Sequence, residues 1–343
     1  MNYPYRILLV KENDEMDALF SFIAQLRQLP DVVIQAHDFP DHDAISSAFA
    51  FGHLLETQGI KTRLVYNGIV DRVSLQKMIE VLAIPIIHAS EAGLTEEDKI
   101  ITVDGCIGEK NVTDLPGDEI AAIDHHEVTA PEGLWFSDIR PEYGATATIM
   151  YEYYQAFKVP MPRNVATALQ VGLAIDTANL TRGFVEADLR AFEYFHSVGD
   201  QELVGRICRN SMKHNELIYY QKMLEVLDRH GNVAFALLEE GCPKNLLGIL
   251  GDFVLALDEV DVVILAATAG ECIYLSLRSE SPDINVSTLV RDVVVQNDIG
   301  FGGGHSHMAG GILDVERLHR SALSNDFFEL FLGEIRNLNV RTF

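Results

Sequence analysis

The triplet Asp124-His125-His126 brings one carboxylate and two imidazoles together directly after the apolar run 120–123. Carboxylates and imidazoles are common protein ligands of divalent metal ions. The apolar run predicts a buried strand, so the triplet is expected at the point where that strand ends. Ligands of open parallel α/β sheets gather at these carboxyl ends, and the triplet is therefore predicted to line a metal site.

Three further apolar runs end in side chains of the same chemical types. The run 32–34 leads into the segment HDFPDHD at residues 37–43, where one imidazole and two carboxylates have the spacing H-x3-D-x-D. The runs 100–103 and 171–175 are each followed by an aspartate. Because the ends of parallel strands meet at one edge of a sheet, the candidate ligands are expected together. They are His37, Asp41, Asp43, Asp104, His125 and Asp176.

Each of these clusters also has a purely structural interpretation. Asp43 stands directly before a predicted helix and could cap it, and Asp104 before Gly105 could belong to a turn. A His-His pair after a strand is common in surface turns. The coincidence of ligand-type side chains at all these predicted strand ends nevertheless favours one shared site.

Mixed carboxylate and imidazole ligands suit two octahedral cations that share one bridging carboxylate. Manganese fits this mixture best, with Mg2+, iron or another divalent cation as alternatives. Thiol-bound zinc is not supported, because the cysteines lie far apart in the sequence, at Cys106, Cys208, Cys242 and Cys272. Two cations roughly 3.5–4 Å apart can activate a water and hold both sides of a phosphoryl group. The reaction predicted for such a site is phosphoester hydrolysis.

A second group of candidate residues lies in the C-terminal third of the chain. Arg278 can bind a phosphate with two hydrogen bonds, Ser276 adds a hydroxyl, and the glycine run 302–304 lets backbone amides approach an anion. Taken singly, the glycines could form a flexible turn and Arg278 a solvated charge. His305 has no apolar sequence neighbours to bury it, which favours a role toward a ligand.

The composition limits the classes of partner and compartment. The chain has 343 residues, of which 48% are hydrophobic and 22% charged, and a formal net charge of −25. This charge opposes binding along a polyanion such as long duplex DNA, whereas a small phosphorylated substrate can be held by bound cations and a few arginines. Separated cysteines and the absence of a long apolar segment lead us to expect a cytoplasmic protein without membrane contact. Whether it forms a homodimer is left open.

The order of strand and helix patterns predicts the α/β class and two domains. Short β-branched runs alternate with helical patterns from residue 31 to about 185, which is typical of a parallel sheet covered by helices. We expect a larger domain at 1–190, with an N-terminal extension of about 30 residues, a helical connector at 191–226 and a smaller α/β domain at 227–343. The active site is expected in the cleft between the two domains.

These motifs resemble those of the DHH phosphoesterases, a RecJ-like superfamily named after the triplet seen here at residues 124–126. The similarity covers nearly all of the chain after residue 30, including HDFPDHDAISS, the acid at Asp104, AIDTANLT, SLRSESPDINVS and FGGGHSHMAGG. The last two segments resemble the substrate-binding domain that accompanies the DHH domain in this family. Glycine is common in the family where His42 and Ala178 stand, and a small-glycine pair where Ser46 and Ser47 stand.

The resemblance implies a role for each matching position. His37 and Asp41 would bind one cation, Asp43, His125 and Asp176 the other, and Asp104 would bridge them. His126 and Asp104 would be the catalytic residues, and Asp124 would orient a ligand without binding the metal itself. Arg278, Ser276, Gly303, Gly304 and His305 would hold the substrate.

Length and charge distinguish among the activities of such a family. A processive single-strand exonuclease of the RecJ type needs a basic channel with aromatic stacking platforms, which this acidic chain does not indicate. The chain is more similar to compact members that degrade very short oligoribonucleotides, remove phosphate from 3'-phosphoadenosine 5'-phosphate, or cleave linear and cyclic dinucleotides. A pyrophosphatase, a polyphosphatase and a non-catalytic nucleotide-sensing module are the alternatives.

Overall fold

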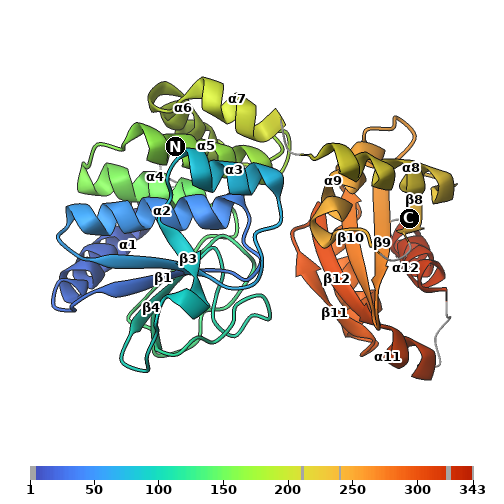
Figure 1. The fold of residues 1–343 in the computed structure, drawn as a ribbon, viewed down its shortest axis with the longest axis horizontal. Helices are drawn as coiled ribbons and strands as arrows, with labels where there is room; N and C mark the ends of the chain where they lie inside the picture. The colour runs from blue at the N-terminus through green and yellow to red at the C-terminus, as the bar shows by residue number, and fades with distance from the viewer. Residues whose placement is uncertain (1–4, 210–211, 239–240, 322–325, 342–343) are drawn as a thin grey trace. The chain divides into compact units, whose positions relative to one another are not determined.

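The computed structural model describes residues 5–209, 212–238, 241–321 and 326–341. It divides into two compact units, Met1–Met212 (unit 1) and Lys213–Phe343 (unit 2) (Figure 1). The stretch predicted as a helical connector is shared between them, since helices α6 (Glu186–Val198) and α7 (Gln201–Arg209) belong to unit 1 and α8 (Leu217–Val226) to unit 2. None of the described helices is long and apolar enough to span a bilayer.

Unit 1 is built on a parallel sheet with the strand order β3-β2-β1-β4-β5-β6. Chain connections lead from β1 outward through β2 to β3, and from β4 outward through β5 to β6. The direction therefore changes between β1 and β4, the place where open α/β sheets bind ligands. The strands are β1 (Val32–Ala36), β2 (Thr62–Tyr66), β3 (Ile86–His88), β4 (Lys99–Val103), β5 (Asp118–Asp124) and β6 (Phe136–Ile139).

Alternate residues of these strands face two different layers. Ile34, Ile101 and Ile123 belong to the main core, which the helices complete, and Figure 1 shows α2, α4 and α5 over this face. Val33 and Ile100 face the other side, where a smaller cluster covers them. The remaining helices are α1 (Tyr5–Leu26), α2 (His42–Thr57), α3 (Val73–Val81), η1 (Ala89–Glu91), α4 (Thr146–Phe157) and α5 (Arg163–Asp176).

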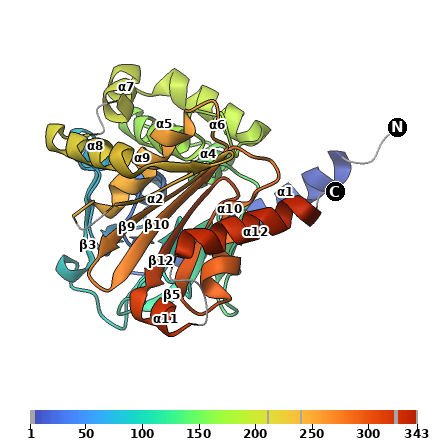
Figure 2. The same ribbon diagram turned by 90° about the vertical axis from the view of Figure 1, so that its right-hand side faces the viewer.

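Unit 2 contains a mixed sheet with the order β11-β12-β10-β9-β8-β7. Only β8 and β9 pair in parallel among its described strands. Helices α9 and α12 pack on opposite faces of this sheet, in separate apolar clusters (Figure 2). Its elements are η2 (His214–Glu216), α8, β7 (Asp228–His230), β8 (Val233–Leu238), α9 (Lys244–Leu255), β9 (Val262–Ala269), β10 (Cys272–Ser279), α10 (Val286–Val290), η3 (Arg291–Val295), β11 (Gly300–Gly304), β12 (Met308–Asp314), α11 (Val315–Arg320) and α12 (Phe327–Arg341).

The structure differs from the sequence interpretation at three places. Asp176 ends helix α5 and does not follow a strand. The apolar run 171–175 is part of this buried helix, and a short apolar run in a buried helix has the same pattern as a buried strand. The glycine run lies in strand β11, where a Cβ at Gly302 would come within 2.7 Å of Val290 and 2.9 Å of a β12 carbonyl. The residue that caps α2 is Asp41 and not Asp43.

Candidate metal centre

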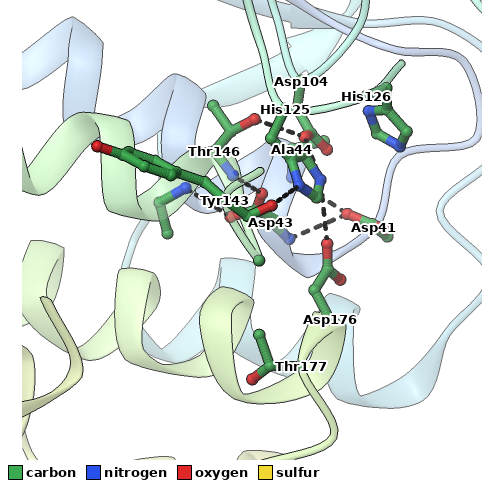
Figure 3. A network of polar contacts seen from close by, with 12 residues as sticks. Asp41, Asp43, Ala44, Asp104, His125, His126, Tyr143, Thr146, Asp176 and Thr177 are labelled. Carbon is green, nitrogen blue, oxygen red and sulfur yellow. Dashed lines mark hydrogen bonds and ion pairs between the residues drawn. The ribbon is translucent and has the colours of Figure 1, made fainter. Parts of the chain in front are cut away.

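Asp104 belongs to a polar cluster at the carboxyl ends of β1, β4 and β5 (Figure 3). Its side chain is 1% exposed. Its Oδ1 is 3.6 Å from His125 Nε2, and its Oδ2 is 3.7 Å from His37 Nε2. Among the described residues, no group hydrogen-bonds Oδ2, although this oxygen is buried. Asp104 thus presents one oxygen toward each of the two imidazoles.

The two imidazoles are oriented in the same way. His125 Nδ1 donates to the carbonyl oxygen of Tyr143 at 3.0 Å, and His37 Nδ1 donates to the carbonyl oxygen of Asp38 at 2.8 Å. Because these protons occupy Nδ1, the Nε2 atom of each ring is the one that faces the carboxylates. Histidines that bind metals commonly use one nitrogen for the metal and the other for such a backbone bond.

Asp41, Asp43 and Asp176 complete the cluster from three directions (Figure 3). Asp41 Oδ1 lies 3.9 Å from His37 Nε2, and Asp176 Oδ2 lies 3.6 Å from His125 Nε2. Ligand atoms within 4.8 Å of one another form the set His37, Asp41 and Asp104 and the set Asp43, Asp104 and His125. Asp104 is the member common to both sets, which is the arrangement expected of a bridging ligand.

Burial and mutual repulsion make three of these carboxylates, Asp43, Asp104 and Asp176, poor anions without a counter-charge. Burial, together with the charge of Asp41, raises the pKa of Asp104 to about 7. Burial and neighbouring carboxylates raise the pKa of Asp43 and of Asp176 well above the ordinary value. Burial and the charge of His126 lower the pKa of His125 to about 4, so this imidazole is neutral at pH 7.

The residues present fit a pair of divalent cations. Imidazole Nε2 atoms face carboxylate oxygens across 3.6–3.9 Å, a separation longer than a hydrogen bond. Acceptor atoms that converge in this way need a cation between them. Nitrogen and oxygen donors without a thiolate suit manganese, and the closest cysteine in sequence, Cys106, is not among the ligand sets of the described residues.

His126 and Asp124 form a separate pair at the edge of this cluster. His126 Nδ1 donates to Asp124 Oδ1 at 2.7 Å, and the same oxygen accepts the backbone N–H groups of His125 and His126. Burial disfavours the imidazolium, but the hydrogen bond and charge of Asp124 outweigh this and raise the pKa of His126 to about 10. His126 is therefore a proton donor at neutral pH.

The N-terminus of α4 contributes contacts that we did not expect from the sequence. Backbone N–H groups of Thr146 and Ala147 donate to the two oxygens of Asp43 at 2.6 and 3.0 Å. The Thr146 hydroxyl donates to Asp104 Oδ1 at 2.8 Å. These bonds fix two of the candidate ligands from the far side, and the only sequence signal for them is the start of a helical pattern after Gly144.

Arg72, the residue that precedes α3, is a second residue not expected from the sequence. It is half-buried, and its positive charge lowers the pKa of Asp41 and of His42 and opposes the rise in the pKa of Asp176. Burial is the largest influence on both of the first two groups. It raises the pKa of Asp41, where the charges of His37 and Arg72 oppose it, and it lowers the pKa of His42 to about 3. Arg72 thus adds a positive charge to the field at the cluster.

Four positions depart from the family pattern: His42, Ser46 and Ser47 make hydrogen bonds, and Ala178 has a positive φ. Buried His42 accepts or donates one hydrogen bond with Ser74 Oγ at 2.9 Å. Ser47 donates to Asp43 Oδ1 at 3.2 Å, and Ser46 donates to the carbonyl oxygen of Asp43 at 3.2 Å. Ala178 has a φ of 48°, in the region that glycine adopts without cost.

In unit 2, the candidate substrate residues lie on β10 and at the end of β11, two strands that β12 separates. Arg278 and Ser276 share one face of β10, where Arg278 is 5% exposed and donates to Asp252 Oδ1 at 2.9 Å and to Ser276 Oγ at 3.2 Å. Gly248 and Gly251 of α9 leave room for this side chain, since a Cβ at Gly248 would lie 2.6 Å from Arg278 Nη2. Gly303 and Gly304 end β11, and half-buried His305 follows them.

Comparison with known proteins agrees with this two-part organisation. Residues 31–173 match the DHH family, N-terminal domain, and residues 230–326 match the DHHA1 domain. Over 281 residues the chain is 28% identical to an uncharacterized protein of Methanocaldococcus jannaschii, covering 81% of this chain and 57% of that protein. Over 327 residues it is 25% identical to a cyclic-di-AMP phosphodiesterase of Geobacillus thermodenitrificans, covering 87% of this chain and 48% of that protein.

A third relative is similar to a shorter part of the chain. A probable manganese-dependent inorganic pyrophosphatase of Shouchella clausii is 26% identical over 156 residues, covering 43% of this chain and 48% of that protein. The chain thus spans about half the length of the curated relatives that it matches.

A solved structure shares the fold of both units. An exopolyphosphatase-related protein from Bacteroides fragilis has a TM-score of 0.74 at 18% identity, covering 95% of this chain and 97% of that one. At this identity the likeness concerns the fold. The predicted α/β class, with a parallel sheet first and a second sheet after it, is thereby confirmed. Together with the two matching domain models, these observations show that the chain belongs to the DHH family, with a DHHA1 domain after its DHH domain.

Proposed function

We propose that this chain is a manganese-dependent phosphoesterase that hydrolyses short oligonucleotides, linear dinucleotides or 3'-phosphoadenosine 5'-phosphate. The observation that supports it most is the position of Asp104, which presents its two oxygens to the Nε2 atoms of His37 and His125. A bridging carboxylate between two imidazoles is the core of a site for two cations. The protein's relatives with named activities act on phosphoester or phosphoanhydride bonds.

In this proposal His37 and Asp41 hold one cation, Asp43, His125 and Asp176 hold the other, and Asp104 binds both. When bound, the cations supply an activated water and neutralise charge on the phosphoryl group. The chain itself orients the ligands: the carbonyl oxygens of Tyr143 and Asp38 fix the imidazole tautomers, and the N-terminus of α4 fixes Asp43.

His126 is proposed as the residue that donates a proton or hydrogen bond to the scissile phosphate. Burial opposes the imidazolium, but the hydrogen bond and charge of Asp124 outweigh it and raise the pKa of His126. Asp124 also fixes the ring by accepting from Nδ1. Arg72 is proposed to add a positive charge for an anionic substrate.

For the nucleotide beyond the scissile bond, we propose residues of unit 2. Arg278 and Ser276 carry donors on one face of β10, and an added Cβ at Gly303 would meet open space. An open glycine backbone and a guanidinium suit a phosphate or ribose. His305 is proposed to contact the same part of the substrate.

A short nucleotide also agrees with the electrostatics of the chain. The net charge of −25 penalises each additional phosphate that lies outside the cation site. A longer single strand would need cationic and aromatic groups along its path. We therefore propose substrates of two to a few nucleotides.

The test is a substrate panel with purified protein and Mn2+. The panel contains a linear dinucleotide, a cyclic dinucleotide, 3'-phosphoadenosine 5'-phosphate, a long single strand and pyrophosphate, with products resolved by chromatography. Asp104→Asn serves as the matched inactive control. The proposal expects metal-dependent turnover of the dinucleotide or of 3'-phosphoadenosine 5'-phosphate, lost in the variant. Binding of these nucleotides without turnover would instead identify a nucleotide-sensing module.

Cyclic-dinucleotide hydrolysis is the second candidate. The relative named as a cyclic-di-AMP phosphodiesterase aligns with 87% of this chain, including both domains, whereas the pyrophosphatase aligns with 43%. Turnover of the cyclic member of the panel faster than the linear one would favour this candidate.

A further inference from the structure

The segment of residues 140–148, between β6 and the first turn of α4, makes four hydrogen bonds to the side chains of the proposed ligands. Tyr143 accepts from His125, Thr146 donates to Asp43 and Asp104, and Ala147 donates to Asp43. Three of these four hydrogen bonds use backbone groups of the segment. The positions of three proposed ligands therefore depend on the conformation of this backbone.

Asp188, on α6, holds the segment on both sides of residues 145–147. Its Oδ2 accepts from the backbone N–H of Gly144 at 3.0 Å, and its Oδ1 accepts from the hydroxyl of Thr148. Asp188 is fully buried, and Thr148 is buried as well. The carboxylate therefore bridges the residue before and the residue after the backbone groups that reach Asp43.

The backbone at Gly144 passes too close to its surroundings to tolerate a side chain. A Cβ there would lie 2.6 Å from Thr177 Cγ2, 2.7 Å from the carbonyl oxygen of Gly183 and 3.2 Å from Asp188 Oδ2. Gly144 is thus packed between Asp188 and the residue that follows Asp176. A shift of Asp188 would be transmitted to this contact and to the start of α4.

The other end of the segment is fixed independently. Arg140 donates to both oxygens of Asp138 at 2.7 and 2.8 Å and also pairs with Glu152. Tyr143 donates to Glu152 at 2.8 Å. The Arg140 network holds residues 138–143, so the part of the segment that depends on Asp188 is 144–148.

We propose that Asp188 is a positioning residue for the metal centre, which acts through Gly144 and Thr148 to hold the α4 N-terminus against Asp43 and Asp104. The inference rests on the proposed metal centre and adds a residue of a helix that supplies no ligand. Partners that orient ligands typically change metal affinity by about 10–100-fold when they are removed.

Asp188 also accepts from the backbone N–H of Val185 at 2.8 Å, at the start of its own helix. A loss of this bond alone would weaken α6 without any role for the metal centre. Thr148→Val separates the two effects, because it removes only the hydroxyl donor and leaves the bond to Val185. Asp200→Ala is the matched control, since Asp200 accepts from Glu202 and Leu203 at the start of α7 and contacts no proposed ligand.

The experiment titrates metal-free full-length proteins with Mn2+ and measures free Mn2+ by electron paramagnetic resonance. Thermal unfolding of each metal-free variant shows that it is folded at the temperature used. We expect Asp188→Ala to raise the Mn2+ dissociation constant about 10-fold or more and Thr148→Val to raise it in the same direction. Asp188→Asn and Thr148→Ser should stay within about 3-fold of the wild type, because they retain hydrogen bonds to the segment. Asp200→Ala should do so as well, because its bonds are to Glu202 and Leu203.

Wild-type affinity in folded Asp188→Ala and Thr148→Val would overturn the inference, as would an equal loss in Asp200→Ala. If Asp188→Ala does not fold, the comparison of Thr148→Val with Thr148→Ser decides it. Nucleotide hydrolysis is measured separately on the wild type. A wild type that binds Mn2+ but cleaves no nucleotide would refute the proposed function and leave the role of Asp188 to the affinity data.

Discussion

Asp41 and Asp43 are linked by a hydrogen bond, in which the backbone N–H of Asp43 donates to Asp41 Oδ1 at 3.0 Å. The same oxygen accepts from Ala44, so that Asp41 is the N-cap of α2. One proposed ligand therefore fixes the first turn that carries another, and the H-x3-D-x-D motif serves both the helix and the metal centre.

Two substitutions at Asp41 separate these roles. Asp41→Asn keeps a side-chain oxygen for the cap, whereas Asp41→Ala removes it and should lower the free energy of unfolding of the metal-free protein by about 1 kcal/mol more. Both should weaken Mn2+ binding, since both remove the carboxylate. Denaturant unfolding and Mn2+ titration check this, and unchanged Mn2+ affinity in Asp41→Asn would mean that Asp41 only caps the helix.

The second prediction concerns pH and Asp104 in the metal-free protein. Burial and Asp41 raise the pKa of Asp104 from 3.8 to about 7, so the folded state binds this proton more tightly than the unfolded state. Stability from the protonated form is present below about pH 4 and is lost as the pH rises through about 7. Asp104→Asn has no carboxyl to deprotonate and does not lose this stability. The Tm of the variant relative to the wild type should therefore rise between pH 5 and pH 8.

The measurement is calorimetry of both proteins with a chelator present. Asp104→Asn should also lose turnover and lower Mn2+ occupancy, because the bridge to both cations is removed. A Tm difference independent of pH would contradict the raised pKa, and retained activity would contradict the bridging role.

Arg278 gives a third prediction, on substrate binding. Arg278→Ala should raise the KM for a dinucleotide by about 10–100-fold, the value of a charge-assisted hydrogen bond, while Mn2+ content stays at the wild-type level. Asp252→Ala is the control, since it removes the partner at 2.9 Å but keeps the guanidinium. Steady-state kinetics and metal analysis are the measurements, and loss of metal in Arg278→Ala would make the residue structural.

The fourth prediction concerns Ala178, whose φ is 48°. Ala178→Gly should raise the free energy of unfolding by about 0.5–1 kcal/mol, because glycine adopts this conformation without steric cost. Ala156→Gly, within α4, should instead lower it by about 1 kcal/mol. Chemical denaturation compares the two, and a loss of stability in Ala178→Gly would show that the conformation is not strained.

The ligand-bearing ends of β1, β4 and β5 could be predicted from a few residues each. The apolar run indicates a buried strand, and the Asp or His after it indicates a ligand at the end of that strand. Asp176 was expected after a strand, whereas it ends helix α5, since a buried helix has no polar face to reveal its period. The strand β11 was missed because glycine disfavours strands, and the close approach of Val290 and a β12 carbonyl explains why glycine stands at Gly302.

The contacts of residues 140–148 could not be predicted for a different reason. Tyr143 and Ala147 act through backbone groups that any residue carries, so that their side chains give no signal. Asp188 lies 44 residues from Gly144 in the chain, and nothing local in the sequence links the two. Such partners emerge only when the fold brings them together.

The central claim is that two cations bind around Asp104, and anomalous diffraction at the manganese edge tests it most directly. Crystals grown with Mn2+ should show two peaks about 3.5–4 Å apart, with Asp104 between them and His37 and His125 each bound through Nε2 to a different ion. A single peak, or peaks away from these side chains, would contradict the account.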